Sequence, residues 1–373
     1  MGLKNGKIGI MLSDDNLVPK TPDDDSSHLL ESWELTDFNI DGNISLSQKF
    51  GHLKVMRSDD GKLILAGYTN YGIIDQTQPT PTNFFNPDTT LGFILDIGIQ
   101  KAKRLTYGSG FYFGQQMLHS QSQKKVSQAD FNQNLFEKIG DKIQTLFQSG
   151  DNTKEIEAIK IQYLFDEYNN ARLLYPNFYA ESYLNLMRII DALADVKGAY
   201  DYAIFVANIT PKMNQEVFEK IKTMSAYADK LVKARSLFNK CLAHAKLKNW
   251  TASHDAMLLL NEADKFVFAC FYSAYQYRNK FVHKGFPFPS IVKDSWGIED
   301  DSGMAYISPT FGQSLSRFHR PETGLQDGDL LDIHAIVGNE AEDFKDTYFL
   351  LVPTWHYLKK IAREAILVKF NSL

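Results

Sequence analysis

An α+β fold is predicted for this chain of 373 residues, with a β-rich N-terminal domain over residues 1–125 and a helical domain over residues 126–373. Three observations predict it. The length suits two domains of about 100–200 residues each. Short segments rich in β-branched and aromatic residues, bounded by turn signals, occupy the first part of the chain. From about residue 129 the apolar residues instead recur with the period of a helix.

The N-terminal domain is predicted from four strand-like segments: His52–Met56, Lys62–Tyr68, Gly92–Ile97 and Gly110–Phe113. Asp60 and Gly61 separate the first two segments, and this dipeptide is typical of a hairpin turn. Prolines among threonines and asparagines predict a loop from Gln76 to Pro87. We expect this domain to sense a trigger, to bind a partner or to regulate the helical domain.

The helical domain is predicted as an antiparallel bundle, because long helices with short connections usually pack in that way. One buried helical face is marked by six residues: Tyr183, Leu186, Met187, Ile190, Leu193 and Ala194. A longer helix is predicted through Val217–Leu242, a third over residues 262–283 and a fourth over residues 354–369. Prolines and strand-like pieces at about residues 286–345 indicate an irregular or β insertion before the last helix.

The composition limits the cellular compartment that suits the protein and the classes of partner that it can bind. A net charge of −5 excludes a global basic field for nucleic acid, although it leaves room for a local basic patch. The two cysteines, Cys241 and Cys270, lie in apolar helix-like stretches, which predicts buried thiols and a reducing compartment. The longest apolar runs fall short of the roughly 20 residues of a membrane helix, and the N-terminus has no signal-peptide pattern. We therefore expect a cytoplasmic protein without a membrane partner.

The stretch that carries chemistry is YQYRNKFVHKG, residues 275–285, at the end of the third predicted helix. A helix turns by about 100° per residue, so Arg278 shares one face with three apolar residues: Val267, Phe271 and Ala274. A guanidinium on that face needs a carboxylate, a phosphate or carbonyl groups as partner, because an unpaired buried charge is costly.

Asn279 and His283 lie four residues apart on an adjacent face, where the amide can orient the imidazole and select its tautomer. Gly285 ends the helix just beyond His283, so a substrate can reach the imidazole. The three polar residues suit phosphodiester cleavage without a metal, with His283 as general base towards a ribose 2′-OH and Arg278 stabilising charge on the phosphorus oxygens. The alternative is structural: Arg278 pairs with a carboxylate of the bundle and His283 caps the helix C-terminus.

The run YRNKFVHKG resembles the signature of the HEPN superfamily (higher eukaryotes and prokaryotes nucleotide-binding), whose motif reads RNxxxH, and it is most similar to the ApeA-like branch. Arg278, Asn279 and His283 occupy all three motif positions. The resemblance covers about residues 130–373 and implies a helical bundle that dimerises and brings two motifs together. Many HEPN proteins are metal-independent ribonucleases that leave a cyclic phosphate and act in toxin–antitoxin, abortive-infection and other defence systems.

The resemblance also implies roles for single residues. His283 would act as general acid or base, Arg278 would bind the phosphate, and Asn279 would orient its neighbours. Some relatives hold the arginine with an acidic residue on an earlier helix, for which Asp191 in the run RIIDAL is the candidate. The implied partner is RNA (tRNA, mRNA or rRNA) together with a second copy of the chain, with no cofactor and no metal. The insertion after the motif would cover the cleft or form the dimer contact.

Two further groups of residues contain side chains that could bind a ligand. Arg317, His319 and Arg320 form a compact basic-aromatic cluster that suits RNA contact by stacking and phosphate binding, and the alternative is an exposed loop with solvated charges. Cys241 and His244 lack the closely paired spacing of a zinc site.

The sequence thus predicts an RNA-cleaving HEPN protein of a prokaryotic defence or toxin type. The alternative is a non-catalytic HEPN module that binds RNA or nucleotide, or that serves as a dimerising scaffold.

Overall fold

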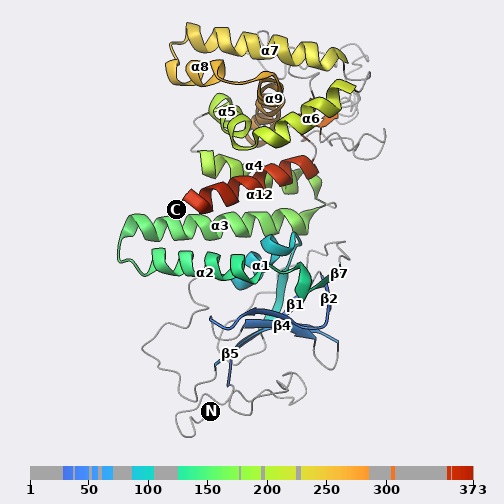
Figure 1. Ribbon diagram of the computed structural model, residues 1–373, viewed down its shortest axis with the longest axis vertical. Coiled ribbons are helices and arrows are strands. Elements are labelled where there is room, and N and C mark those ends of the chain that lie inside the picture. Colours follow the sequence, from blue (N-terminus) through green and yellow to red (C-terminus); the bar gives the residue numbers. More distant parts are fainter. Residues whose placement is uncertain are drawn as a thin grey trace, which may run out of the picture. The chain divides into compact units, whose positions relative to one another are not determined.

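The computed structural model describes most of the chain and forms two compact units, Met1–Asn185 and Leu186–Leu373 (Figure 1). The residues that it describes are 28–36, 38–49, 53–57, 61–69, 86–104, 125–175, 178–194, 198–223, 228–284, 304–306, 351–353 and 355–372. The predicted domain boundary at residue 125 lies inside the first unit, and the two units divide later, within a helix. Of the helices described, none is both long enough and apolar enough to cross a membrane.

The first unit contains a five-stranded antiparallel sheet with the strand order β3-β4-β5-β1-β6. Its strands are β1 (His28–Thr36), β3 (Ile44–Ser47), β4 (Leu53–Arg57), β5 (Leu63–Thr69) and β6 (Gln100–Arg104). A separate parallel pair joins β2 (Asn39–Asp41) to β7 (Lys125–Ser127). The predicted hairpin is confirmed, because β4 and β5 pair up to Arg57 and Leu63, and Gly61 between them has a φ of +85°.

The centre of the sheet is buried on both faces. Val55 faces Leu65 across the ladder, and Met56 faces Ile64. Neighbouring residues of a strand point to opposite faces, and all four side chains are buried. Both faces therefore need a cover, and this agrees with the continuous apolar run LILA in β5 and with the adjacent apolar pair Val55 and Met56 in β4.

The strand predicted at Gly92–Ile97 is wrong, because these residues belong mainly to the helix α1 (Pro87–Leu95). A short apolar run that is buried all round has no visible period, so the sequence pattern does not separate a helix from a strand. Pro87, which the sequence placed in a loop, begins the helix, where its fixed φ and missing N–H are harmless. Asp96 ends the helix in the left-handed conformation. The strand predicted at Gly110–Phe113 lies outside the described residues.

Two long helices complete the first unit: α2 (Gln133–Phe147) and α3 (Asn152–Leu174). They follow a short 3₁₀ turn, η2 (Gln128–Asp130), pack against each other, and contact α1. The side chains of Asn132 and Asp151 accept hydrogen bonds from backbone N–H groups in the first turns of α2 and α3, which satisfies donors that a helix start leaves unpaired.

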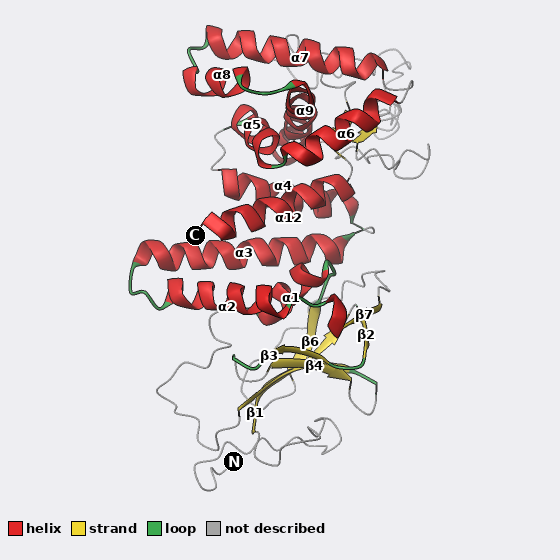
Figure 2. Ribbon diagram, viewed as in Figure 1, coloured by secondary structure: helices red, strands yellow, loops and turns green. Residues whose placement is uncertain are grey.

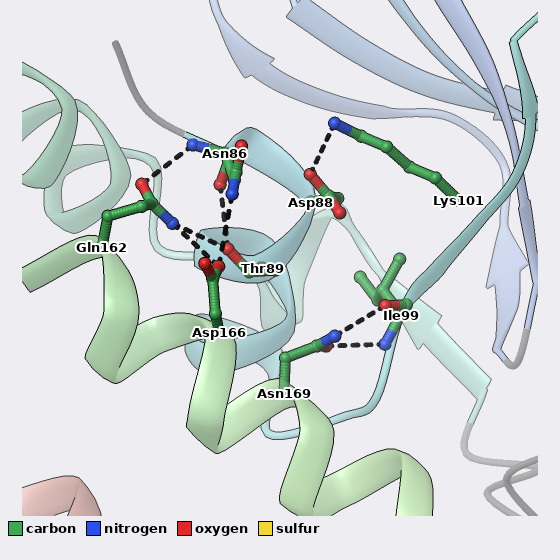
Figure 3. Close-up of polar contacts among 8 residues, drawn as sticks. All are labelled: Asn86, Asp88, Thr89, Ile99, Lys101, Gln162, Asp166 and Asn169. Carbon is green, nitrogen blue, oxygen red and sulfur yellow. Dashed lines mark hydrogen bonds and ion pairs between the residues drawn. The ribbon is translucent and has the colours of Figure 1, made fainter. Parts of the chain in front are cut away.

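Polar side chains of α3 fix the position of α1 and the strand that follows it (Figure 3). The buried Asn169 amide accepts from the Ile99 N–H and donates to the Ile99 carbonyl, both at 2.8 Å. Gln162 donates to the Thr89 hydroxyl at 3.0 Å and accepts from the Asn86 N–H at 2.9 Å. These bonds satisfy backbone and side-chain groups that would otherwise be buried without a partner.

The second unit is mostly helical. Its helices are α5 (Ala199–Ile209), α6 (Pro211–Thr223), α7 (Ala228–Leu247), α8 (Thr251–Leu258), α9 (Glu262–Lys284) and α12 (Trp355–Ser372), and α4 (Tyr179–Ala194) enters it from the first unit. The helices predicted over residues 262–283 and 354–369 are confirmed by α9 and α12. The single helix predicted through Val217–Leu242 is wrong, since α6 and α7 are separate. The chain between them lacks Gly and Pro, so nothing in the pattern marked the break.

Helix α9 is the central element of this unit, with α5, α6 and α7 packed against it (Figure 2). Strands β8 (Met304–Tyr306) and β9 (Leu351–Pro353) pair antiparallel. β8 confirms one strand-like piece of the predicted insertion. The rest of that insertion, with Arg317, His319 and Arg320, lies outside the described residues. An antiparallel sheet followed by a largely helical remainder agrees with the predicted α+β class.

Candidate functional site

The site begins with the face of α9 that carries Arg278. Val267, Phe271 and Ala274 are buried on this face, as the sequence predicts, and only 20% of the Arg278 side chain is exposed. The helix therefore carries a guanidinium into a largely apolar environment. There the charge needs a partner, because water screens it poorly.

That partner is Asp191, which α4 supplies from a distant part of the sequence. Arg278 Nη2 lies 2.6 Å from Asp191 Oδ2, and 18% of the Asp191 side chain is exposed. Arg278 Nη1 donates to Asn279 Oδ1 at 3.0 Å. The guanidinium carbon lies 5.1 Å from the centre of the Tyr275 ring, within range of a cation–π contact. The structure thus brings together Arg278, Asn279 and Asp191 of the predicted site.

The electrostatics of the pair are set by burial and by charge. Burial raises the pKa of the Asp191 carboxyl above its ordinary value of 3.8, and the Arg278 guanidinium offsets only part of that rise. Arginine has five N–H donors, and Asp191 and Asn279 accept from two of them. Tyr275 also forms a side-chain hydrogen bond with Arg278, so among the described residues only the remaining N–H groups of the guanidinium are left for an anionic ligand such as a phosphate group.

Asn279 contacts Arg278, a partner that the sequence analysis did not name for it. Its side-chain oxygen accepts from Arg278, so it orients the guanidinium. His283 belongs to the last turn of α9, one turn beyond Asn279. The side chain of His283 lies outside the described part of the structure, so the predicted contact between Asn279 and His283 stays a prediction.

Sequence reasoning missed one member of the site, Tyr202 of α5. Its ring is fully buried and packs at 5.0 Å from the Tyr275 ring. The Tyr202 hydroxyl oxygen and Asp191 Oδ1 are both buried without a hydrogen-bond partner among the described residues. Tyr202 lies in the apolar run AYDYAIF, which is typical of an ordinary core helix, and no sequence signal distinguishes it.

The other end of α9 is held by a second buried polar cluster. Asn214 of α6 donates to Asp264 Oδ1 at 2.9 Å and to the Ala207 carbonyl at 2.8 Å. Its side-chain oxygen accepts from Thr210 and from Tyr357 of α12, each at 3.1 Å. Because the four bonds satisfy the Asn214 amide and join α6, α9 and α12, we interpret this cluster as structural.

The cysteines and nearby histidines form no ligand cluster in the described parts of the chain. Cys241 and Cys270 are free and buried, and burial raises the pKa of the Cys241 thiol to about 12. His244 Nδ1 lies 3.0 Å from the Tyr200 hydroxyl, and His254 pairs with Asp255. A search of the described residues finds no group of three or more His, Cys, Asp and Glu side chains that could hold a metal ion.

Comparison of the chain with protein-family models, with curated proteins and with solved structures finds no match. The residues of the site itself therefore provide the basis for assigning a function.

Proposed function

We propose that this protein is a metal-independent endoribonuclease of the HEPN type that acts in the cytoplasm in prokaryotic defence, as an abortive-infection or toxin-like factor. The observation that supports the proposal is the Arg278–Asp191 pair, which keeps the arginine of an RNxxxH motif at the end of α9, half-buried and oriented. Arg278 keeps 20% of its side chain exposed, so a ligand can reach the guanidinium from the solvent.

The proposed reaction uses the 2′-hydroxyl of the RNA as nucleophile. His283 removes the 2′-OH proton, and the oxygen attacks the neighbouring phosphorus. Arg278 stabilises the additional negative charge on the non-bridging oxygens. The P–O5′ bond breaks and the leaving oxygen takes up a proton, which gives a 2′,3′-cyclic phosphate and a 5′-hydroxyl end. In a homodimer, the second motif copy supplies the group that donates this proton.

Asp191 and Asn279 act through the arginine in this scheme. Both accept hydrogen bonds from Arg278, so the guanidinium is oriented before the substrate arrives. Such preorganisation lowers the cost of aligning the charge in the transition state. We assign both as positioning residues.

The test is incubation of the purified full-length protein with total RNA and with tRNA in the presence of EDTA. The parent is expected to cleave RNA and leave cyclic-phosphate ends, and His283→Ala and Arg278→Ala are expected to lose cleavage by at least about 100-fold. His254→Ala is the matched control, because His254 lies on α8 and pairs with Asp255. Equal cleavage by the parent and His283→Ala would contradict the proposed catalysis.

A second candidate is a non-catalytic HEPN module that binds RNA or nucleotide or serves as a dimerising scaffold. The pairing of Arg278 with two protein acceptors favours it, since a structural arginine would be held in the same way. RNA binding by the parent without cleavage, lost in Arg278→Ala, would support this candidate. Sedimentation of the full chain tests the homodimer that both candidates propose.

A further inference from the structure

Two unpaired polar atoms occur in the same buried cluster. Asp191 uses Oδ2 to bind Arg278, while its Oδ1 is buried without a hydrogen-bond partner in the described structure. The hydroxyl oxygen of Tyr202 is in the same condition. A buried polar atom that lacks a partner costs free energy, so such atoms are rare in folded proteins unless they serve a purpose.

A chain of contacts places Tyr202 beside the ion pair. The Tyr202 ring lies 5.0 Å from the Tyr275 ring, at an interplanar angle of 44°. The Tyr275 ring in turn lies 5.1 Å from the Arg278 guanidinium carbon, and Arg278 lies 2.6 Å from Asp191. Burial is the main cause that raises the pKa of the Tyr202 hydroxyl; the charge of Asp191 raises this pKa further and that of Arg278 lowers it, so the phenol lies within electrostatic reach of both.

The two atoms are chemically complementary. A carboxylate oxygen accepts hydrogen bonds and a phenol donates one. Burial raises the pKa of Tyr202 well above its ordinary value, so the phenol keeps its proton at neutral pH. Phenylalanine would fill the same space against Tyr275 and Phe271, and only the hydroxyl distinguishes tyrosine from it at this position.

We propose that Tyr202 is a positioning residue for Arg278: its hydroxyl donates to Asp191 Oδ1, directly after a small side-chain adjustment or through one bound water. The donated bond keeps the carboxylate ionised and directed at the guanidinium. Its consequence for RNA cleavage rests on the proposed function, whereas its effect on Asp191 does not.

The groups that act on Asp191 come from three helices. Arg278 and Tyr275 belong to α9, and Tyr202 to α5. Asp201 of α5 acts on Tyr275, and the exposed Arg188 lies one turn before Asp191 on α4. Tyr202→Phe removes only the Tyr202 hydroxyl and leaves the other groups in place. A change in the Asp191 pKa in this variant can therefore be assigned to that hydroxyl.

The direct test is titration of the Asp191 carboxyl by NMR in the full-length protein labelled at the aspartate carboxyl carbons, with Asp191→Asn to assign the signal. Tyr202→Phe is expected to raise the Asp191 pKa by about one unit, since it removes a hydrogen bond to the charged form. Tyr357→Phe is the matched control, because it removes a buried hydroxyl that bonds to Asn214 instead. An unchanged Asp191 pKa in Tyr202→Phe would overturn the proposal.

If Tyr202→Phe folds poorly, a comparison of melting temperatures tests whether the Tyr202 hydroxyl bonds to Asp191. In the parent, Tyr202→Phe should lower the melting temperature, and this loss should vanish in an Asp191→Leu background, which has no acceptor. A loss that persists there, or a rise in melting temperature in the parent, would show that the hydroxyl does not serve Asp191.

Cleavage supplies a third readout. If the parent cleaves RNA, Tyr202→Phe should shift the acid limb of kcat/KM to higher pH by about one unit and recover activity above it. If the parent cleaves no RNA, the proposed function fails and the NMR titration still decides the role of Tyr202.

Discussion

Arg278 and Asp191, separated by 87 residues of sequence, form an ion pair of 2.6 Å between α9 and α4. Each side chain alone would be a poorly solvated charge. Together they neutralise each other, and the geometry directs one edge of the guanidinium at the carboxylate.

Removal of one member should therefore cost more than the loss of an exposed ion pair. We expect Asp191→Ala to lower the free energy of unfolding by about 1–3 kcal/mol, because it leaves Arg278 without a counter-charge. Denaturant unfolding of the full chain measures this. Lys222→Ala, which breaks an exposed pair with Glu219, should cost at most about 0.5 kcal/mol. Similar losses in the two variants would contradict the argument.

Stability and activity should depend on pH in opposite directions across the titration of Asp191. Burial raises its folded pKa above 3.8, so between that value and the folded pKa the folded state binds more protons than the unfolded state. This carboxyl's contribution to stability is present below 3.8 and is lost as the pH rises through the folded pKa.

The proposed cleavage needs the ionised carboxylate and should rise over the same window. Unfolding curves and cleavage rates measured from pH 4 to pH 7 in parallel for the parent and Asp191→Asn would show this. As the pH rises, the free energy of unfolding of the parent should fall relative to that of Asp191→Asn. A shift in favour of the parent would show that the folded pKa is lowered instead.

The Asn214 cluster should be sensitive to the loss of its central amide. Asn214→Leu leaves Asp264, Tyr357 and Thr210 without their shared partner, so we expect a loss of at least about 2 kcal/mol in the free energy of unfolding. Tyr357→Phe removes one donor and should cost about 1 kcal/mol. A loss in Asn214→Leu no larger than that in Tyr357→Phe would show that the cluster is not cooperative.

Gly92 should not tolerate a side chain. A Cβ there would lie 2.7 Å from Asn169 Oδ1 and 3.0 Å from the Ile97 carbonyl oxygen. Gly92→Ala should therefore disturb the Asn169–Ile99 contacts and cost about 2 kcal/mol or more of unfolding free energy. At Gly198 nothing lies within 4 Å of an added Cβ, and Gly198→Ala should cost less than about 1 kcal/mol. Calorimetry of both variants measures whether the contact of Gly92 with Asn169 and Ile97 makes an added Cβ destabilising.

The thiols should react only when the protein opens. Cys241 is buried and its pKa is raised to about 12, and burial also raises the pKa of Cys270, so both stay protonated at pH 8. A thiol reagent at that pH should label neither cysteine in the native protein and both in denaturant. Rapid labelling of either cysteine under native conditions would show that α7 or α9 opens locally.

The parts of the fold that the sequence predicts well have a long period or a specific motif. α9 and α12 show sustained helical spacing of apolar residues. Arg278 continues an apolar face of its helix, so the sequence itself indicates that the guanidinium needs a partner such as a carboxylate. Asp191 could be named only from the resemblance, since nothing in its own neighbourhood indicates a partner on α9.

The remaining features depend on tertiary contacts that no local pattern encodes. α1 is buried on all sides, so its residues have no polar face to mark a helix. The role of Asn169 follows from its bonds to Ile99, and the role proposed for Tyr202 follows from two buried polar atoms that lack a partner among the described residues. A cut at residue 125 would also separate α2 and α3 from the sheet and α1 with which they form one unit.

Polar contacts hold helix α9 near both of its ends. Asp264 fastens its first turn to Asn214, and Arg278 fastens its last turns to Asp191. A shift of α9 by one residue relative to its neighbours would rotate the helix by about 100° and move it about 1.5 Å along its axis. Both contacts would then break together. A reorientation of α9 therefore either carries α4 and α6 along with it or breaks the Asp264–Asn214 and Arg278–Asp191 contacts.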